Sequence, residues 1–275
     1  DTDRSRGLGD VYKRQDVYLI STPSVYITLP QLSKTVASGG VFAATLSAKG
    51  NKADIAVKTE ICNSEAEPKR TKLVTTIEDT DGNTLEQVSQ SKVIKPAETY
   101  SFNQRINVSG IKLWHPNNPN LNFIKTEVWV DGIMVDAIKT RFGVRSVKMN
   151  GPKGLYINGE PFNEKLIGAN RHQDYVYVGN ALPNSGQWRD VKKLREAGCN
   201  IIRVAHYPMD DAFYDACDEF GVLTTSANPG WHFFNFKNEL FEKRLYEDTR
   251  NLVRKNRNHC SIITVSYTHL TLPTT

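Results

Sequence analysis

The chain has 275 residues, of which 39% are hydrophobic and 24% charged, and its formal net charge is +5. This composition is typical of one large or two ordinary globular domains and argues against a disordered chain. No apolar run approaches the ~18 residues of a membrane span. No basic run carries aromatic residues in a nucleic-acid-binding pattern, so we expect neither a membrane nor a nucleic-acid partner.

One short DNA sequence, read on its two strands, accounts for a segment near each end of the chain. DVYKRQ, at residues 10–15, is encoded by GATGTGTATAAGAGACAG. The reverse complement of that string, read from its third base, encodes VSYTH, as found at residues 265–269, and then supplies C, the first base of a CTN codon for the Leu at residue 270. The string resembles the end of a transposase-based sequencing adapter. We therefore expect residues 1–15 and 265–275 to be adapter-derived and not native, and the native chain to be a fragment of a longer protein.

The stretch from residue 25 to residue 147 alternates apolar and polar side chains with period two, as in Ile124, Thr126, Val128 and Val130. Asp-Gly pairs at 81–82 and 131–132 separate such runs, and this dipeptide is a strong signal for a tight hairpin. Strands are expected to begin near Val25, Val41, Asp54, Lys72, Glu86, Thr99, Asn122 and Met134. Short strands at this spacing predict an immunoglobulin-like β-sandwich over residues 16–147.

Residues 148–264 show a different pattern, in which predicted strands alternate with predicted helices. A hairpin at Asn158-Gly159 leads to a strand that should end at Gly168. Helical patterns at 187–198, 210–221 and 239–254 then alternate with strands at 200–208 and 222–230, and SIIT at 261–264 starts a further strand. Strand–helix repeats build parallel sheets. No Gly-rich phosphate turn follows a strand, so we expect the first part of a (β/α)8 TIM barrel, about three strands, rather than a doubly wound sheet.

Polar and aromatic residues collect where these strands end. Function in parallel sheets gathers at the carboxyl ends of strands. Arg203 lies within an otherwise apolar strand and requires an anionic partner. A lone histidine can equally be a packing residue, and Trp231 can be a loop anchor or a surface on which a sugar stacks. The residues concerned are Asn170, Arg171 and His172 after the first strand, Arg203, His206 and Tyr207 at the second, and Asn228, Trp231 and His232 after the third.

Three stretches of this half carry a specific resemblance. GANRHQD (168–174), IIRVAHYPMDDAFYDACDEFGV (201–222) and RKNRNHCSIIT (254–264) resemble the barrel motifs of glycoside hydrolase family 2, the β-galactosidase and β-glucuronidase family. The stretch at 113–147 resembles the end of that family's immunoglobulin-like domain. The resemblance implies a retaining exo-β-glycosidase that hydrolyses terminal β-galactosides. A β-glucuronidase of the same family and a non-catalytic carbohydrate-binding member are the alternatives.

The resemblance also implies roles for individual residues. The two catalytic glutamates of the family would both lie beyond Thr264, so we expect no catalytic residue in this chain. Arg203 would orient the nucleophilic carboxylate, and His172 and His206 would bond sugar hydroxyls. Asn170, Asp174 and Trp231 complete the expected substrate-binding set. We assign no catalytic role to the other glutamates of this half, since each is expected on a hairpin or a helix. They are Glu160, Glu164, Glu196 and Glu219.

Other properties follow less directly. Four scattered cysteines lack metal-ligand spacing, so we expect free thiols or core residues and no metal site. No cofactor is visible, although the family leaves open a divalent cation in the full-length protein.

The expected partner is a carbohydrate substrate; oligomeric state stays open, as do periplasmic, secreted and cytoplasmic locations in a bacterium. Departures from the family pattern are Gln173 for an acidic residue, Ser226-Ala227-Asn228 without the acidic pair, and Cys260 for proline.

Overall fold

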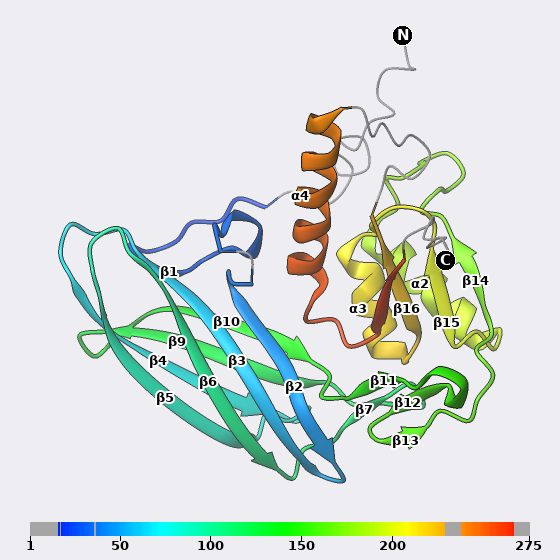
Figure 1. The fold of residues 1–275 in the computed structure, drawn as a ribbon, viewed down its shortest axis with the longest axis horizontal. Helices are drawn as coiled ribbons and strands as arrows, with labels where there is room; N and C mark the ends of the chain where they lie inside the picture. Colours follow the sequence, from blue (N-terminus) through cyan, green and yellow to red (C-terminus); the bar gives the residue numbers. More distant parts are fainter. Residues whose placement is uncertain (1–15, 17, 36, 229–237, 267–275) are drawn as a thin grey trace, which may run out of the picture. The chain divides into compact units, whose positions relative to one another are not determined.

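A computed structural model describes residues 16, 18–35, 37–228 and 238–266. The chain forms two compact units (Figure 1). The first, which we call the sandwich unit, comprises Ile20–Asn163 and Arg254–Cys260. The second, the barrel unit, contains Glu164–Val253 and the described residues from Ser261 onward. Contacts thus group residues 148–163 with the sandwich, across the boundary predicted at 147/148; the domain assignment itself stays a prediction.

The sandwich unit contains two antiparallel sheets of four strands. In the first sheet, β3 (Lys52–Asn63) pairs on one side with β1 (Val25–Ile27) and β2 (Val41–Lys49) and on the other with β6 (Thr99–Ser109). The second sheet runs in the order β10 (Ile133–Phe142), β9 (Asn122–Val130), β4 (Lys69–Glu78), β5 (Thr84–Ile94). All eight strands begin at or close to the predicted positions. The two-residue strands β7 (Trp114–His115) and β8 (Asn118–Pro119) were not predicted, because two residues are too few to show an alternation.

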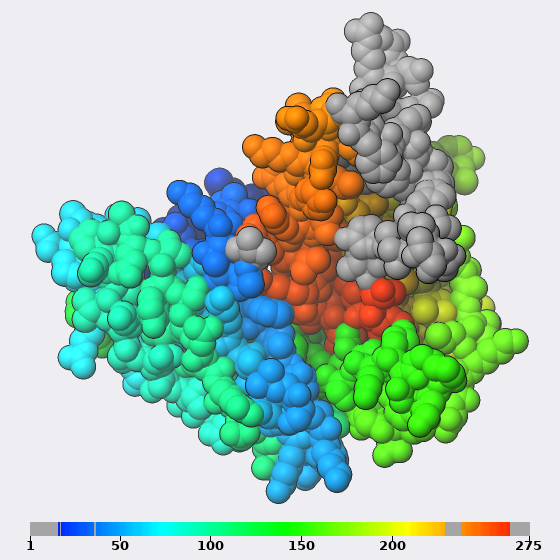
Figure 2. Space-filling model, viewed as in Figure 1, coloured from blue at the N-terminus to red at the C-terminus, as the bar shows by residue number. Residues whose placement is uncertain are grey.

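The inner faces of the two sheets form one hydrophobic core. Side chains at alternate positions, such as Ile55 and Phe102 in the first sheet and Leu73 and Ile124 in the second, are fully buried. Figure 2 shows side chains closing the space between the strand ribbons of Figure 1. The turn between β9 and β10 has positive φ at both Asp131 and Gly132, which is why the Asp-Gly pair predicted it correctly.

Short elements complete this unit. A small antiparallel sheet contains β11 (Val147–Met149), β12 (Leu155–Ile157) and β13 (Glu160–Pro161), and it turns at Asn158-Gly159 as predicted. Two 3-10 turns span Pro30–Leu32 and Gly151–Lys153.

The segment Arg254–Cys260 contains the last residues of a long helix and the turn after it, and it contacts the sandwich strands. The Arg257 guanidinium donates to the carbonyls of Ser38 and Gly39. The Asn258 amide accepts from the backbone N–H of Ala43 (3.1 Å) and donates to the carbonyl of Val41 (2.8 Å). Asn258 therefore satisfies backbone groups of β2 as a neighbouring strand would.

The barrel unit contains a parallel sheet in the order β14 (Gly168–Arg171), β15 (Ile201–Val204), β16 (Leu223–Ala227), β17 (Ile262–Ser266). The connecting helices are α2 (Asn184–Glu196), α3 (Asp211–Phe220) and α4 (Glu239–Asn256). The strand–helix order and the parallel sheet confirm the predicted start of a barrel. Among the described residues, no helix is long and apolar enough to span a membrane.

Three predicted strand limits were wrong. The first barrel strand begins at Gly168 instead of ending there, and β15 ends at Val204, before the expected limit at Pro208. The third strand, β16, ends at Ala227, before the expected limit at residue 230. The strand that begins in SIIT is β17, and it continues through Val265 and Ser266, which pair with Ser226 and Ala227. Strand pairing uses peptide groups that nearly every residue supplies, so side-chain patterns locate strand ends poorly.

One side of the parallel sheet packs on α2 and α3. Ile202 and Val204 of β15 are buried there with Val191 of α2 and Phe213 of α3. The Asp210 carboxylate caps α3 by accepting from the Ala212 N–H (3.0 Å). The helix ends at Gly221, whose φ of 65° is left-handed, as the sequence predicted. Successive strand residues point to opposite sides, so Arg203 lies on the side away from these helices.

Candidate functional site

The register of the first two parallel strands places two predicted site residues side by side. Asn170 of β14 is opposite Arg203 of β15. The Arg203 Nη1 donates to the Asn170 Oδ1 at 3.3 Å. Arg203 is half-buried, yet within the described part of the chain no carboxylate pairs with it. A half-buried guanidinium with only a neutral amide partner can still accommodate an anion.

The two predicted histidines lie together at the carboxyl ends of the same strands. The rings of His172 and His206 are 5.5 Å apart between centroids and nearly perpendicular, at 86°. His172 is also 6.1 Å from the ring of Tyr207. His172 is exposed and His206 is half-buried, just past β15 where the Ala205–His206 peptide is cis. Their meeting at one end of the sheet is the arrangement that the sequence predicted.

Gln173 holds the loop that follows His172. It is buried, its Nε2 donates to the Asn180 carbonyl (3.2 Å), and its Oε1 accepts from the Asp210 N–H (3.0 Å). Its own N–H donates to the Tyr207 hydroxyl (2.9 Å). Burial raises the pKa of Tyr207, which keeps this hydroxyl protonated. A carboxylate at position 173 could only accept, so glutamine, which does both, is explained by these contacts.

Asp174 lies at the base of the same loop and is exposed. With its amide nitrogen turned toward Asp174, Asn180 donates to the Asp174 Oδ1 at 2.9 Å. The carboxylate therefore has one neutral donor partner and remains accessible to solvent. It is the acidic member of the predicted substrate-binding set.

Arg171, which the sequence grouped with its neighbours Asn170 and His172, has a structural role. Its side chain is buried on the helix side of the sheet, where Nη2 donates to Gln187 (2.7 Å) and to Asp190 (2.9 Å) of α2. The guanidinium also lies over the ring of Phe213 of α3, 4.9 Å from its centroid. The alternation along a strand already implies that Arg171 faces away from Asn170.

Asn228, at the end of β16, also binds within the fold. Its amide nitrogen donates to the Thr249 hydroxyl of α4 at 2.8 Å. This contact joins the third strand to α4 and accounts for an amide where the family pattern has an acid. Trp231 and His232 lie outside the described residues.

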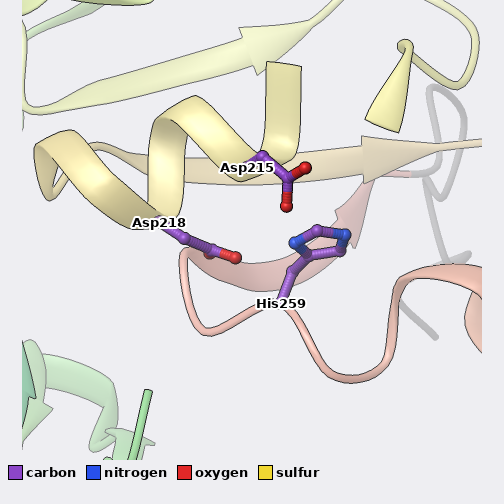
Figure 3. Close-up of side chains that lie close together, drawn as sticks. All are labelled: Asp215, Asp218 and His259. Carbon is purple, nitrogen blue, oxygen red and sulfur yellow. The ribbon is translucent and has the colours of Figure 1, made fainter. Parts of the chain in front are cut away.

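Two carboxylates on α3 are close in space without belonging to the sheet edge. Asp215 and Asp218 are three residues apart and project from the same helix (Figure 3). Asp218 is buried, and its Oδ1 accepts from the Ser261 N–H at 2.8 Å, just before β17. This bond fixes the start of the fourth strand. The four cysteines are free thiols, with Cys217 and Cys260 buried, as predicted.

Comparisons with known proteins agree with this arrangement. Residues 40–145 match the model of glycosyl hydrolases family 2, and residues 147–269 match the TIM barrel domain of the same family. A β-galactosidase from Thermoanaerobacterium thermosulfurigenes is 38% identical over 60% of this chain and 22% of its own length. A β-glucuronidase from Formosa agariphila is 28% identical over 92% of this chain and 25% of its own.

A solved structure of a β-glucuronidase from Bacteroides uniformis superposes with a TM-score of 0.80 at 29% identity, covering 89% of this chain and 29% of that one. The chain spans about a fifth of the length of the first curated relatives it matches. The matches to both family models, in the order sandwich then barrel, show that the chain belongs to glycoside hydrolase family 2.

Proposed function

We propose that this chain supplies the immunoglobulin-like domain and the first barrel strands of a retaining exo-β-glycosidase that removes terminal β-galactosyl groups. The observation that supports this most directly is Arg203. It lies at the carboxyl end of an inner strand, half-buried, and among the described residues it has only the Asn170 amide as a partner. In our proposal its anionic partner is the nucleophilic glutamate of the complete enzyme.

The remaining site residues follow from their positions. His172 and His206 present two imidazoles at one end of the sheet, where they would bond hydroxyls of the sugar next to the scissile bond. Such bonds favour catalysis when they tighten in the transition state. Asn170 holds Arg203 in place, and Asp174 would accept from a sugar hydroxyl. Trp231 remains a proposed sugar contact.

The chemistry needs two carboxyl groups about 5–5.5 Å apart, one acid and one nucleophile. We propose that neither belongs to the 275 residues. Glu160 lies on β13, Glu196 ends α2 and Glu219 lies on α3, all of them exposed, so none is at the carboxyl end of a parallel strand. Glu164 is exposed and precedes β14.

A β-glucuronidase is the second candidate. A β-glucuronidase from Formosa agariphila and one from Bacteroides uniformis are similar to this chain over both units, at 92% and 89% of its length, and a β-galactosidase from Bacteroides ovatus is similar over 84%. Similarity over both units is therefore found with both activities, which keeps the β-glucuronidase beside the first candidate. The sandwich and barrel strands do not separate the two, since the proposed contacts are with groups that both sugars carry.

The test is a pair of chromogenic assays, with a β-galactoside and a β-glucuronide, on the protein encoded by the complete gene that contains residues 16–264. We expect Arg203→Met to lower kcat at least ~100-fold with a small change in KM, since its contact acts on the nucleophile. His172→Ala should mainly raise KM. Lys193→Met, an exposed change on α2, is the matched control.

The 275-residue chain itself should show no turnover, since general-acid assistance alone is worth ~10²–10⁴-fold and the nucleophile would also be missing. Turnover by this chain that disappears in Arg203→Ala would overturn the proposal that both carboxylates lie elsewhere. Hydrolysis of only the glucuronide by the complete protein would replace the first candidate by the second.

A further inference from the structure

The outer face of the second sandwich sheet is hollowed around a tryptophan. Trp129 of β9 points away from the core, and the register places Lys72 of β4 opposite it, with Ser91 of β5 opposite Lys72. These side chains line a hollow of about 560 Å³ that lies entirely within the sandwich unit. This volume is in the range of small-ligand sites.

The floor of the hollow is apolar. Trp129 is half-buried, and Val74, which also faces outward, is 8% exposed. Trp129 Nε1 is buried and has no hydrogen-bond partner among the described residues, an arrangement that is uncommon in native structures. The indole of Trp129, with the apolar side chain of Val74 in the same lining, offers a surface for the C–H face of a pyranose ring. The amide of Gln87 and the hydroxyl of Ser91 stand in the lining as groups that bond sugar hydroxyls.

The rim carries two cations that have no acidic partner within the described part of the chain, Arg70 and Lys72. Glu127, which also lines the hollow, is already paired with Lys125, at 2.6 Å between Nζ and Oε1. Asp131 stands at the rim in the β9–β10 turn. The two cations outnumber this one unpaired carboxylate, so the local charge complements an anionic ligand.

We propose that this hollow binds an anionic saccharide, with a pyranose ring on the indole of Trp129 and its carboxylate or sulfate group against Arg70 and Lys72. The sandwich is then a substrate-anchoring domain and not only a spacer. This site is separate from the proposed glycosidase site, and its test measures no hydrolysis, so either proposal can fail while the other stands.

The test measures the binding of defined oligosaccharides to the full 275-residue chain. Calorimetry gives the affinity, and NMR spectroscopy of the indole N–H resonances locates the site. The probes are a galacturonic acid tetrasaccharide, a sulfated galactose tetrasaccharide and neutral galactotetraose. We expect saturable binding of at least one anionic probe, at least tenfold tighter than of the neutral one, and weaker as salt is raised. The Trp129 indole resonance should shift, while that of fully buried Trp114 should not.

Matched variants locate the site. Trp129→Ala should weaken binding at least tenfold, whereas Phe123→Ala, half-buried on the same face of the same strand, should stay within twofold. Arg70→Gln with Lys72→Gln should abolish the preference for anionic probes, whereas Lys52→Gln on the other sheet should preserve it. Should Trp129→Ala fail to fold, the same binding measurements on Trp129→Phe and on the charge variants decide whether the hollow binds the saccharide. No saturable binding, equal affinity for the neutral probe, or no response to the charge variants would overturn the proposal.

Discussion

The two units bury their strands in different ways. In the sandwich unit each sheet covers the inner face of the other, and Ile55, Phe102 and Ile124 are completely buried. In the barrel unit the helices cover one side of the sheet, while on the other side Asn170 is exposed and Arg203 is half-buried. Parallel sheets are usually covered on both faces. The residues proposed to contact sugar are therefore those that the helices leave uncovered.

This difference separates stability from function within one chain. The sandwich core is complete within the described strands, so its free energy of unfolding should depend on packing. The exposed apolar residues just before β14, Leu166 (41%) and Ile167 (53%), show that the barrel unit leaves apolar surface uncovered. We expect its amides to exchange with solvent faster than those of the sandwich strands.

The largest effect is expected from truncating the sandwich core. Phe102→Ala removes a fully buried ring and should lower the free energy of unfolding of the sandwich unit by about 3–5 kcal/mol. Hydrogen exchange measured per strand reports each unit separately. Phe123→Ala, half-buried on the outer face, is the control and should cost about 1 kcal/mol or less. Loss of protection in β14–β16 instead of the sandwich strands would contradict the division into two cores.

The barrel unit should respond most to Arg171. Arg171→Met leaves Asp190 and Gln187 without their shared donor and removes the contact with Phe213. Breaking a buried ion pair is costly, and with Asp190 only 22% exposed we expect a loss of about 3 kcal/mol. The matched change Arg189→Met alters a side chain that is 46% exposed and should cost less than about 1 kcal/mol. Urea unfolding followed in barrel amides distinguishes the two.

Alkaline pH should destabilise the barrel unit through Tyr214. Burial raises the pKa of Tyr214 to about 12, whereas an exposed tyrosine ionises near pH 10. The folded pKa is the higher one, so this contribution to stability is fully present below about pH 10 and is lost as pH rises through 12, by roughly 3 kcal/mol in all for two pKa units. Tyr214→Phe should flatten this fall in a pH series of urea midpoints. An unchanged slope would show that other groups dominate it.

The smallest effect is expected at the ion pair between the buried Asp54 and the exposed Arg105 in the sandwich unit. The hydrogen bonds from Arg105 hold the pKa of Asp54 below its usual value. The contribution to stability is therefore present above the unfolded pKa near 4 and is lost as pH falls through the lower folded pKa. Asp54→Asn should make the sandwich less sensitive to acid between pH 4 and 2, measured by circular dichroism. Glu86→Gln, an exposed change on β5, should not.

The sequence identified the architecture because the local signals agreed with the tertiary contacts. The alternation along β9 predicts a strand, Asp131-Gly132 predicts a tight turn, and Gly221 predicts the end of a helix; the structure has all three. The convergence of His172 and His206 followed from the rule that parallel strands end at one edge. These inferences needed only the period of the pattern and the direction of the strands.

What the sequence did not show depends on contacts between distant residues. Arg171 looked like a site residue because its partners Gln187 and Asp190 are on another element. Gln173 stands where the family pattern has an acidic residue, and only its hydrogen bonds to Asn180 and Asp210 explain the amide at this position. The hollow around Trp129 requires the register of three strands, which no single segment encodes.

The contacts of Arg254–Cys260 with β2 have a consequence for synthesis on the ribosome. Asn258 occupies the edge groups of Val41 and Ala43, but it is translated 116 residues after Phe142, the last residue of β10. At about 5–20 residues per second this is a delay of roughly 6–23 s, during which the nascent sandwich has all its strands and an open edge. We expect the edge of β2 to stay open to pairing with other chains until residue 258 leaves the exit tunnel and closes it.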